Sequence, residues 1–461
     1  ISAVSPQNET LLRALTRRLG RPRCPSPRRL PRKPPQQFTK EGAENGWIVV
    51  LKDDAPPSAF RRTIRDLAIA GFAGPRYTFD FGGPGALRGH VVSGPGSEIA
   101  VASMAESPYV DFIEPDTKLS LSDHEAPRGV HGGVVDKPTK SWGLHRLSHG
   151  PLKEGEPLEY RRNGTGRTGW VYIIDTGIAL SHPEFGGRAK WGGTFMKGME
   201  ALITDTACKS NESWIPDGGD DHGHGTHCAG IAGGSSLGVA QETNLVAVKV
   251  MDKWGGGMDS NLLRGLAWAL KDATDHDRLD KSVISMSIGG LIKPEYLRTG
   301  KPNAVMLATR AASQKGVFVV AASGNSAIPA KKASPAAEPE VCTVSAIDRN
   351  DQPARFNNYG PEVDLLAPGV DILSAWPRNR TQKLDGTSMA APFVAGLGAY
   401  FMDLDGPGSA TPGRQMCERL KNLASYRKGV EDKETPQNFT DIKNQYTKVA
   451  SNGWQLELEA E

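Results

Sequence analysis

The segment Gly218–Gly230, GGDDHGHGTHCAG, holds the side chains of this chain that are most able to do chemistry. Two aspartates precede a group of three histidines and a cysteine: His222, His224, His227 and Cys228. Histidine, cysteine and carboxylate side chains are the usual ligands of zinc. Histidine is also the commonest general acid or base near neutral pH. The segment is therefore a metal site, the source of one catalytic base, or a loop with ordinary surface histidines.

The spacing within this segment argues against zinc. Gly223 and Gly225 indicate a turn, and the small residues after them predict a helix that begins near Thr226. Neighbouring helical residues point about 100° apart, so His227 and Cys228 would not face the same ion. On composition alone, the zinc site remains an alternative.

Two residues elsewhere in the chain favour acid–base chemistry. Ser388 lies in DGTSMAAPFVAG, between a glycine turn and a small-residue helix, where free helix N–H groups could stabilise an oxyanion. A serine nucleophile needs a base, and the base needs an acid to orient it. Asp175 ends the apolar run YIID, although such an aspartate also suits a turn or a helix N-cap. The chain order Asp175, His224, Ser388 is one of the three orders known for such triads.

These residues need a framework that brings them together. Four apolar, β-branched runs predict parallel strands buried on both faces, at 169–175, 244–252, 282–290 and 316–325. Helical stretches alternate with them, at 259–275, 302–315 and 388–403. The alternation predicts an α/β fold with a doubly wound, mostly parallel sheet. Ligands bind at the carboxyl ends of strands in such sheets, and Asp175 and Asn325 fall at such ends.

The part of the chain before this sheet differs in its predicted elements and in its composition. Residues 45–118 follow the order βαββαβ, which predicts a small α+β domain of the split-βαβ, ferredoxin-like kind. Residues 119–140 are polar, contain Gly and Pro, and predict an exposed linker. Residues 1–40 are rich in arginine and proline and predict a disordered basic segment.

The composition limits the range of functions. Hydrophobic residues are 38% and charged residues 23% of 461, and no apolar run reaches the ~20 residues of a membrane span, so we expect a soluble globular protein. Residues 1–40 hold ten Lys or Arg and one acid, so the net charge of +3 conceals an acidic remainder. We therefore expect no binding of nucleic acid. Because the chain begins with Ile1 and not Met, we expect its precursor to start upstream.

Cysteines and sequons indicate the compartment. The odd number of cysteines, five, requires that at least one is free or pairs outside the chain. Five N-x-[ST] triplets point towards the secretory route and glycosylation; they begin at Asn8, Asn163, Asn211, Asn379 and Asn438.

Four segments together resemble the signatures of the subtilisin-like serine proteases, the subtilases: VYIIDTGIALSHPEF, GHGTHCAGIAGG, AASGN and GTSMAAPFVAG. The finer resemblance is to the proteinase K group of secreted fungal enzymes. The segment SWGLHRLS of this chain resembles the N-terminus of the mature enzymes of that group. The resemblance is strong over residues 141–402 and weaker over 47–118, which are similar to the family's inhibitory propeptide. The resemblance implies a secreted, monomeric serine endopeptidase in residues 141–461. It also implies a self-processing zymogen whose inhibitory propeptide is residues 45–118 and whose processing site lies in 119–140.

The resemblance also implies roles for the reactive residues. Asp175 would orient His224, His224 would be the general base, and Ser388 would be the nucleophile. Asn325 would donate its side-chain amide to the oxyanion hole, together with the backbone N–H of Ser388. Cys228 would be a buried thiol beneath the base, which implies sensitivity to mercury-type reagents.

Substrate binding is implied by the same comparison. The walls of the primary specificity pocket and the opposite edge strand would be Ser287, Ile288, Gly289, Ala322, Ser323, Gly324, Gly255, Gly256 and Gly257. A peptide or protein substrate would add itself between these edges as a β-strand. Small, uncharged walls imply a broad preference for large apolar or aromatic residues before the cut bond.

A structural calcium ion is implied as well, with Asp364 and the carbonyls of Pro339 and Val341 as ligands. It would stabilise and not catalyse, and the alternative is that Asp364 only caps a turn. No catalytic metal is implied. Cys342 and Cys417 match a disulfide of the group.

The expected partners are protein substrates and the chain's own propeptide, whose tail after Asp116 would lie in the cleft. No nucleic-acid or membrane partner is expected. Two alternatives from other classes remain open: an inactive homologue that binds peptides without cutting them, and the zinc-site protein.

Overall fold

The structure is a computed structural model that describes residues 46–69, 75, 77–82, 87–93, 104–105, 107–121, 141–196, 219–406, 411, 413–426 and 448–453. All of them belong to one compact unit. Several predictions lie outside the described residues: the basic segment 1–40, nearly all of the linker 119–140, and most of the second helix expected in the small domain. The described part of the chain has no helix long and apolar enough to cross a membrane.

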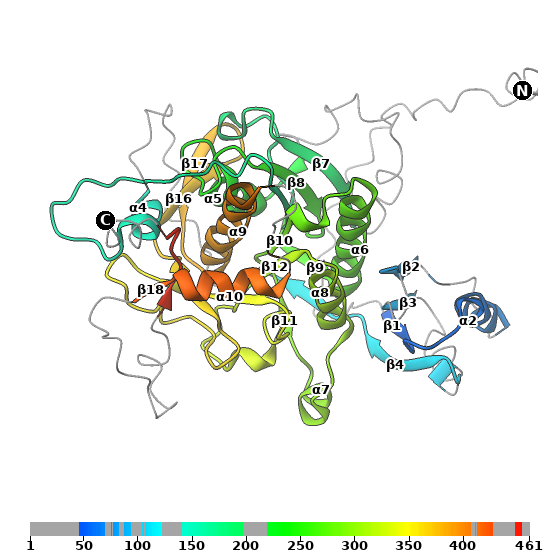
Figure 1. Ribbon diagram of the computed structural model, residues 1–461. Helices are drawn as coiled ribbons and strands as arrows, with labels where there is room; N and C mark the ends of the chain where they lie inside the picture. The colour runs from blue at the N-terminus through cyan, green and yellow to red at the C-terminus, as the bar shows by residue number, and fades with distance from the viewer. Residues whose placement is uncertain are drawn as a thin grey trace, which may run out of the picture. The chain divides into compact units, whose positions relative to one another are not determined.

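A nine-stranded sheet forms the centre of the larger domain (Figure 1). Its strands lie in the order β18 (Ser425–Tyr426), β19 (Lys448–Val449), β15 (Leu365–Pro368), β14 (Cys342–Ile347), β12 (Phe318–Ala322), β10 (Ser282–Met286), β6 (Trp170–Asp175), β8 (Asn244–Lys249) and β7 (Ala189–Thr194). Every neighbouring pair is parallel except β18 and β19. The predicted doubly wound α/β fold is thus confirmed.

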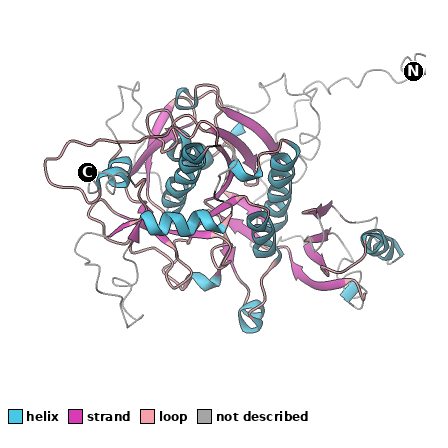
Figure 2. Cartoon of the chain, in the orientation of Figure 1, coloured by secondary structure: helices cyan, strands magenta, loops and turns pink. Residues whose placement is uncertain are grey.

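Helices cover both faces of this sheet (Figures 1 and 2). They are α4 (Trp142–His149), α5 (His224–Gly233), α6 (Asp259–Asp275), α7 (Pro294–Thr299), α8 (Ala304–Gln314), α9 (Thr387–Asp405) and α10 (Arg414–Leu423). Alternate residues of β6 enter two different cores. Val171 and Ile173 pack with α5 and α9, whereas Tyr172 and Ile174 pack with α6 and α8. Because both faces are buried, the strand is apolar at nearly every position.

The small domain is built on a four-stranded antiparallel sheet. It consists of β1 (Gly46–Leu51), α2 (Pro57–Ile69), β2 (Tyr77–Asp80), β3 (Arg88–Ser93) and β4 (Val110–Pro115), with the strands in the order β2-β3-β1-β4. Ile48 and Val50 on one face of β1 belong to the same core as α6 and α8. Val49 and Leu51 on the other face pack with Ala59 of α2. The sheet is therefore buried on both faces, and one of them lies on the helices of the larger domain.

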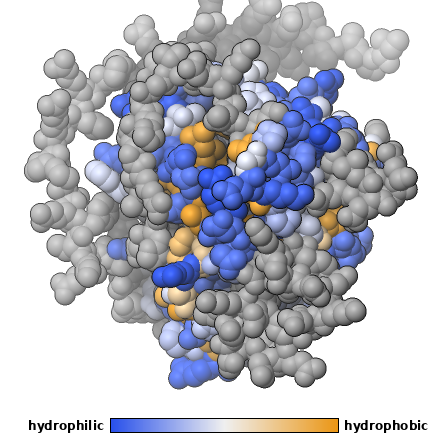
Figure 3. Space-filling model, turned by 90° about the vertical axis from the view of Figure 1, so that its left-hand side faces the viewer, coloured by the Kyte–Doolittle hydropathy of each residue, from blue (hydrophilic) through white to orange (hydrophobic). Residues whose placement is uncertain are grey.

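Short pairs of strands complete the chain: β5 (Lys118–Ser120) with β9 (Gly256–Met258), β11 (Gly290–Leu291) with β13 (Ala333–Ser334), and β16 (Ile372–Trp376) with β17 (Arg380–Leu384). Single 3-10 turns occur at Pro183–Phe185, Leu279–Lys281 and Ala330–Lys332. A disulfide joins Cys342 to Cys417, and Cys228 is a buried free thiol. On the face shown in Figure 3, hydrophilic residues predominate among those that are coloured, with apolar residues between them.

Candidate active site

Asp175 and His224 form a buried pair at the carboxyl end of β6. The His224 Nδ1 atom lies 2.7 and 2.9 Å from the two carboxylate oxygens of Asp175. Both side chains are almost completely buried. The backbone N–H of Thr176 donates to the same carboxylate at 2.7 Å, which fixes its orientation. A carboxylate can only accept, so the ring proton lies on Nδ1 and Nε2 remains as the basic nitrogen.

His224 is the first residue of α5, and not a loop residue before a helix. The predicted start near Thr226 is therefore wrong by two residues. Gly223 is the N-cap and has φ +115°, a conformation that other residues rarely adopt. A Cβ atom on Gly223 would also lie 2.4 Å from the ring of Trp376. This glycine lets the chain turn sharply enough to place His224 on the first turn of the helix.

Asp220 holds this turn, and the sequence reasoning missed it. Its Oδ1 accepts hydrogen bonds from Thr176 Oγ1 and from the backbone N–H groups of His222 and Gly223, at 2.8 to 3.1 Å. Its Oδ2 accepts from the N–H and the hydroxyl of Thr226, at 2.9 and 2.6 Å. An acidic residue just before a helix start is the signal that could have found it, because free N–H groups gather there.

Ser388 is the second residue of α9 and lies close to this pair. Its hydroxyl donates to the carbonyl of Ser287 at 3.0 Å, and the Ser287 hydroxyl donates to the carbonyl of Ser388 at 2.7 Å. The thiol of Cys228 lies 3.9 Å from both ring nitrogens of His224 and donates to the Ser388 carbonyl at 3.5 Å. The thiol thus contacts both residues. Burial raises the pKa of Cys228 to about 11, so the thiol is neutral at physiological pH.

Asn325 presents an amide group beside Ser388. Its side-chain oxygen accepts hydrogen bonds from the backbone N–H and the hydroxyl of Thr387. Its Nδ2 atom is buried and has no hydrogen-bond partner among the described residues. A buried donor without a partner is costly, which indicates a position prepared for an acceptor that arrives with a ligand.

The other two histidines of the opening segment do not converge with His224 on one point. The Nε2 atom of His227 lies 3.0 Å from the carbonyls of both Ile372 and Gln382, to which it donates. Burial lowers the pKa of His227 to about 3, so the ring is neutral. His222 accepts a hydrogen bond from the backbone N–H of His224 through Nδ1, at 3.3 Å. These contacts assign both rings to packing and to the turn, which speaks against the zinc alternative.

The predicted substrate edges are paired with the chain's own segment. Strand β5 lies antiparallel to β9, with Leu119 opposite Gly257 and Ser120 opposite Gly256. Ser120 also forms an antiparallel bridge with Gly289 on its other side. The backbone N–H of Leu121 continues the ladder by donating to the carbonyl of Gly255. An extended segment therefore already lies between these two edges.

The remaining predicted wall residues lie on the neighbouring strands. Ser287 and Ile288 are buried directly after β10, and Ala322 is half-buried at the end of β12. Ser323 is buried and shares a hydrogen bond with the Ser345 hydroxyl. Gly324 has φ +99°, and a Cβ atom there would lie 2.3 Å from the Asn358 amide. This glycine lets the chain turn away after Ser323 and present Asn325 to the site.

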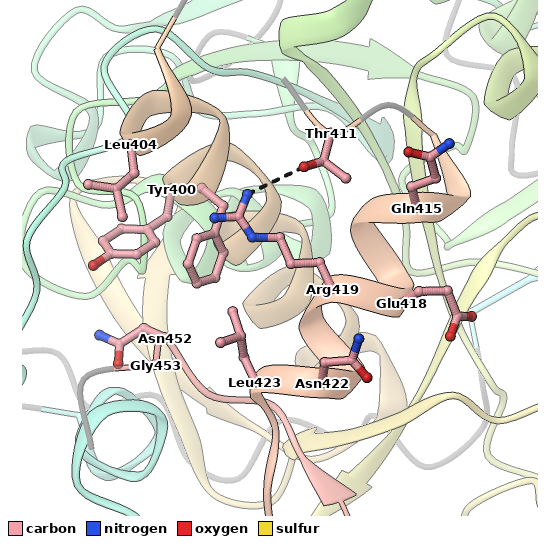
Figure 4. Close-up of a pocket in the computed structure, with 11 residues that line it drawn as sticks. Tyr400, Leu404, Thr411, Gln415, Glu418, Arg419, Asn422, Leu423, Asn452 and Gly453 are labelled. Carbon is pink, nitrogen blue, oxygen red and sulfur yellow. Dashed lines mark hydrogen bonds between the residues drawn. The ribbon is translucent and has the colours of Figure 1, made fainter. Parts of the chain in front are cut away.

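A separate hollow of about 750 Å³ lies between the C-terminal half of α9 and α10 (Figure 4). Tyr400, Leu404 and Arg419 line it, and Arg419 donates to Thr411 across it. Leu404 is sixteen residues after Ser388 in the same helix, which corresponds to about 24 Å at 1.5 Å per residue. The hollow is therefore not part of the site at the start of α9.

The predicted calcium ligands do not fit a calcium ion. The Arg414 guanidinium donates through Nη1 to the carbonyl of Val341 at 2.7 Å and to Asp364 Oδ2 at 2.8 Å. Its Nη2 binds the other oxygen of Asp364. Of the three expected ligand groups, the Val341 carbonyl and the Asp364 carboxylate thus already bind another cation. The third is the carbonyl of Pro339. The structure assigns the oxygens of Val341 and Asp364 to an arginine, and we derive no role for calcium from them.

Comparison with known proteins identifies the family. A profile described as Peptidase_S8: Subtilase family matches residues 166–441. Subtilisin-like protease 1 of Arthroderma otae is 35% identical over an aligned length of 392 residues, and the alignment covers 83% of this chain and 71% of that protein. Subtilisin-like protease 6 of Arthroderma gypseum is 36% identical over an aligned length of 403 residues, and the alignment covers 84% of this chain and 88% of that protein. The crystal structure of a cold adapted subtilisin-like serine proteinase has a TM-score of 0.56 and 32% identity, and covers 68% of this chain and 99% of its own.

A doubly wound sheet that brings an aspartate, a histidine and a serine together is the architecture of a class of serine hydrolases. The profile matches more than half of the chain and the identity extends over most of it, so this chain belongs to the subtilase family. It is therefore a serine endopeptidase, and its substrates are proteins.

Proposed function

We propose that Ser388 is the nucleophile of this endopeptidase, that His224 is its general base and that Asp175 orients the base. The observation that carries the proposal is the buried Asp175–His224 contact of 2.7 Å beside Ser388. It fixes the tautomer in which Nε2 carries no proton and can accept one. The unpartnered amide of Asn325 supports the proposal, since an oxyanion hole needs such a donor.

The reaction follows from these positions. The Ser388 hydroxyl turns from the Ser287 carbonyl towards His224, and its oxygen attacks the scissile carbonyl carbon while its proton passes to Nε2. Asn325 Nδ2 and the backbone N–H of Ser388 stabilise the negative oxygen of the tetrahedral intermediate. When the C–N bond breaks, His224 returns the proton to the departing amine, which leaves an acyl-enzyme. Water, activated by the same base, then releases the acid and restores the serine.

The small domain, residues 45–118, acts in this proposal as an intramolecular inhibitor. Strand β5, which directly follows the domain in the chain, occupies the edges that a substrate would use. Glu114 accepts a hydrogen bond from the backbone N–H of Ala304, the first residue of α8, at 3.0 Å. Asp116 accepts one from the N–H of Ser260 in the first turn of α6, at 2.9 Å. Two carboxylates at two helix N-termini give the domain a defined docking position.

The register of β5 also predicts the processing bond. Ser120 lies opposite Gly289, and Ser287 precedes Gly289 by two residues. Position 122 lies beyond the described residues; a continuation of the same antiparallel register would bring it opposite Ser287, whose carbonyl contacts the Ser388 hydroxyl. The bond to be cut is then the one that follows Ser122. Ser122 is not large and apolar, but an intramolecular cut gains so much from proximity that side-chain preference matters less.

For substrates cut in trans, we propose a broad preference for large apolar or aromatic residues before the cut. The support is the small and uncharged character of the walls, which include Ala322, Ser323 and Gly324. We also propose that the enzyme is secreted as a monomer. Two of the sequons, at Asn163 and Asn379, are exposed and would accept glycans.

The experiment that tests the proposal compares the full chain with its Ser388→Ala variant after expression. The unchanged chain should yield a mature fragment whose new N-terminus is Asp123, as determined by N-terminal sequencing. Ser388→Ala should remain uncut. The same new N-terminus in purified Ser388→Ala protein would show that another protease makes the cut. A cut at a different bond that does not occur in Ser388→Ala would support self-processing, but it would refute the bond predicted from the register of β5.

A further inference from the structure

Three distant segments meet at the guanidinium of Arg414. Val341 lies directly before β14, Asp364 lies directly before β15, and Arg414 begins α10. The disulfide between Cys342 and Cys417 ties the same helix to the same strand, with Cα atoms 5.6 Å apart. Arg414 is three residues before Cys417, so the disulfide and the arginine lie one turn apart on α10.

The Arg414 guanidinium binds oxygens of the other two segments, as a coordinated cation would. Nη1 contacts both the Val341 carbonyl and Asp364 Oδ2, and Nη2 contacts Asp364 Oδ1 and Glu418 Oε1. The backbone N–H of Thr343 adds a bond of 2.9 Å to Asp364 Oδ2. Burial lowers the pKa of Arg414, but its hydrogen bonds to Asp364 and the negative charges nearby outweigh this and raise the pKa above its ordinary value. The guanidinium is therefore always charged.

We propose that the Arg414 guanidinium is a built-in cation that replaces a bound calcium ion at Asp364, and that its removal uncovers a latent calcium site. A carboxylate and backbone carbonyls are ligands that suit calcium. They equally suit a guanidinium, whose planar donors match a carboxylate in a bidentate manner. The two cations cannot share these oxygens, because both are positive and both need the same lone pairs.

The surroundings favour the arginine over the ion. Lys421 Nζ lies 3.6 Å from Asp364 Oδ1, so a second positive charge already faces this carboxylate. The Asp364 side chain is only 9% exposed and that of Arg414 is 23% exposed, so the pair is shielded from competing solvent ions. The protein would therefore hold α10 against the sheet without a dissociable ion, and a chelator would not loosen this contact.

The test measures bound calcium and thermal unfolding in full chains that carry Ser388→Ala, which prevents self-digestion. Calcium is counted by equilibrium dialysis, and the midpoint Tm is recorded with excess calcium and with chelator. With Arg414 present, Asp364→Asn should leave the number of bound ions unchanged. Arg414→Ala should bind one ion more per chain, and calcium should raise its Tm relative to chelator by more than it does in the parent. Asp364→Asn added to Arg414→Ala should abolish both gains.

Two variants act as matched controls. Arg419→Ala removes another guanidinium from α10, which binds Asp405 and not Asp364, and should gain no ion. Arg414→Lys keeps a positive charge near Asp364 and should also gain none. The proposal is overturned if Asp364→Asn alone removes a bound ion from the Arg414 protein, or if Arg414→Ala gains none. If Arg414→Ala does not fold in chelator, the number of calcium ions bound to the Arg414 protein and to its Asp364→Asn variant still tests the proposal. These outcomes are independent of the proposed triad.

Discussion

The side-chain oxygen of Asn325 accepts two hydrogen bonds from Thr387, one from its backbone N–H at 2.9 Å and one from its hydroxyl at 2.7 Å. Since the oxygen is held by Thr387, the amide nitrogen must point the other way, into the site. Thr387 also immediately precedes Ser388. This contact therefore sets the position of the proposed oxyanion donor, Asn325, relative to the proposed nucleophile, Ser388.

Asn325→Ala should lower kcat by about 10²–10³ with little change in KM, a range that the subtilisin family itself established for such a donor. Thr387→Val should lower kcat by a smaller factor, roughly fivefold to tenfold, because the backbone N–H still holds Asn325 after the hydroxyl is lost. Steady-state kinetics on a peptide substrate measure both.

Thr387→Ser is the matched control, since it keeps the hydroxyl and should restore nearly full kcat. If Thr387→Val lowers Tm but leaves kcat unchanged, the hydroxyl stabilises the fold without positioning Asn325.

Asp220→Asn should loosen the turn that carries His224. Five hydrogen-bond donors face the Asp220 carboxylate. In Asp220→Asn, the amide N–H₂ group would replace one acceptor oxygen and would itself face donors. We expect this to lower the free energy of unfolding by about 2–4 kcal/mol. We also expect a fall in kcat, since His224 would lose its fixed position. Denaturant unfolding and steady-state kinetics check the two effects.

The neighbouring residue supplies the comparison. Asp221 is about one-third exposed, and its partner Lys249 also donates to the carbonyl of Thr176, so Asp221→Asn should cost less than Asp220→Asn. Equal losses in the two variants would contradict the role given to Asp220.

The docking of the small domain should weaken as the pH rises. Burial raises the pKa of Glu114 to about 7, against the opposing hydrogen bond from Ala304 and the positive charge of Lys293. Burial, and then the charges of Glu114 and Asp116, also raise the pKa of Asp259. A carboxyl whose pKa is higher in the docked state binds a proton on docking. Docking is thus strongest below about pH 4.5 and weakens as the pH rises to about 7.

Binding of the separated small domain to the mature enzyme should therefore weaken by about tenfold to a hundredfold between pH 5 and pH 7.5. Inhibition constants at each pH measure it. Glu114→Gln does not titrate and should show a much flatter profile. A profile as steep as that of the unchanged domain would assign the effect to other groups.

Cys228 should resist alkylation in the folded enzyme. Its thiol is fully buried, and its pKa of about 11 leaves almost no thiolate at pH 7.5. Mass spectrometry after iodoacetamide treatment should find Cys228 unmodified in native protein and modified after denaturation in urea. Rapid modification of native protein would contradict the burial. The mercury sensitivity implied by the family stays a separate prediction.

Much of the sheet was predictable because its strands are short, apolar on both faces and separated by amphipathic helices. The predicted helix 259–275 coincides with α6. The predicted strand 282–290 is too long, since β10 ends at Met286. Its last residues, 287–290, continue as a wall of the proposed substrate edge, and no proline or charged residue marks the point where the strand stops. An apolar run alone does not show where pairing within a sheet stops.

Contacts between distant residues could not be predicted in this way. Arg414 lies fifty residues after Asp364, and only the path of the chain between them brings the two together. The same holds for Asp220, whose partner Thr176 lies directly after β6 and 44 residues earlier in the chain. In both cases the residue type was visible, but the partner was set by tertiary structure.

Covalent labelling of folded, propeptide-free protein with a fluorophosphonate probe, with and without a chelator, tests the central claim most directly. We predict labelling at Ser388, located by peptide mapping, that survives the chelator and is lost in His224→Ala. Such labelling would also exclude an inactive homologue and a zinc-dependent reaction. Absence of labelling in correctly folded protein, or labelling that the chelator removes, would contradict the account.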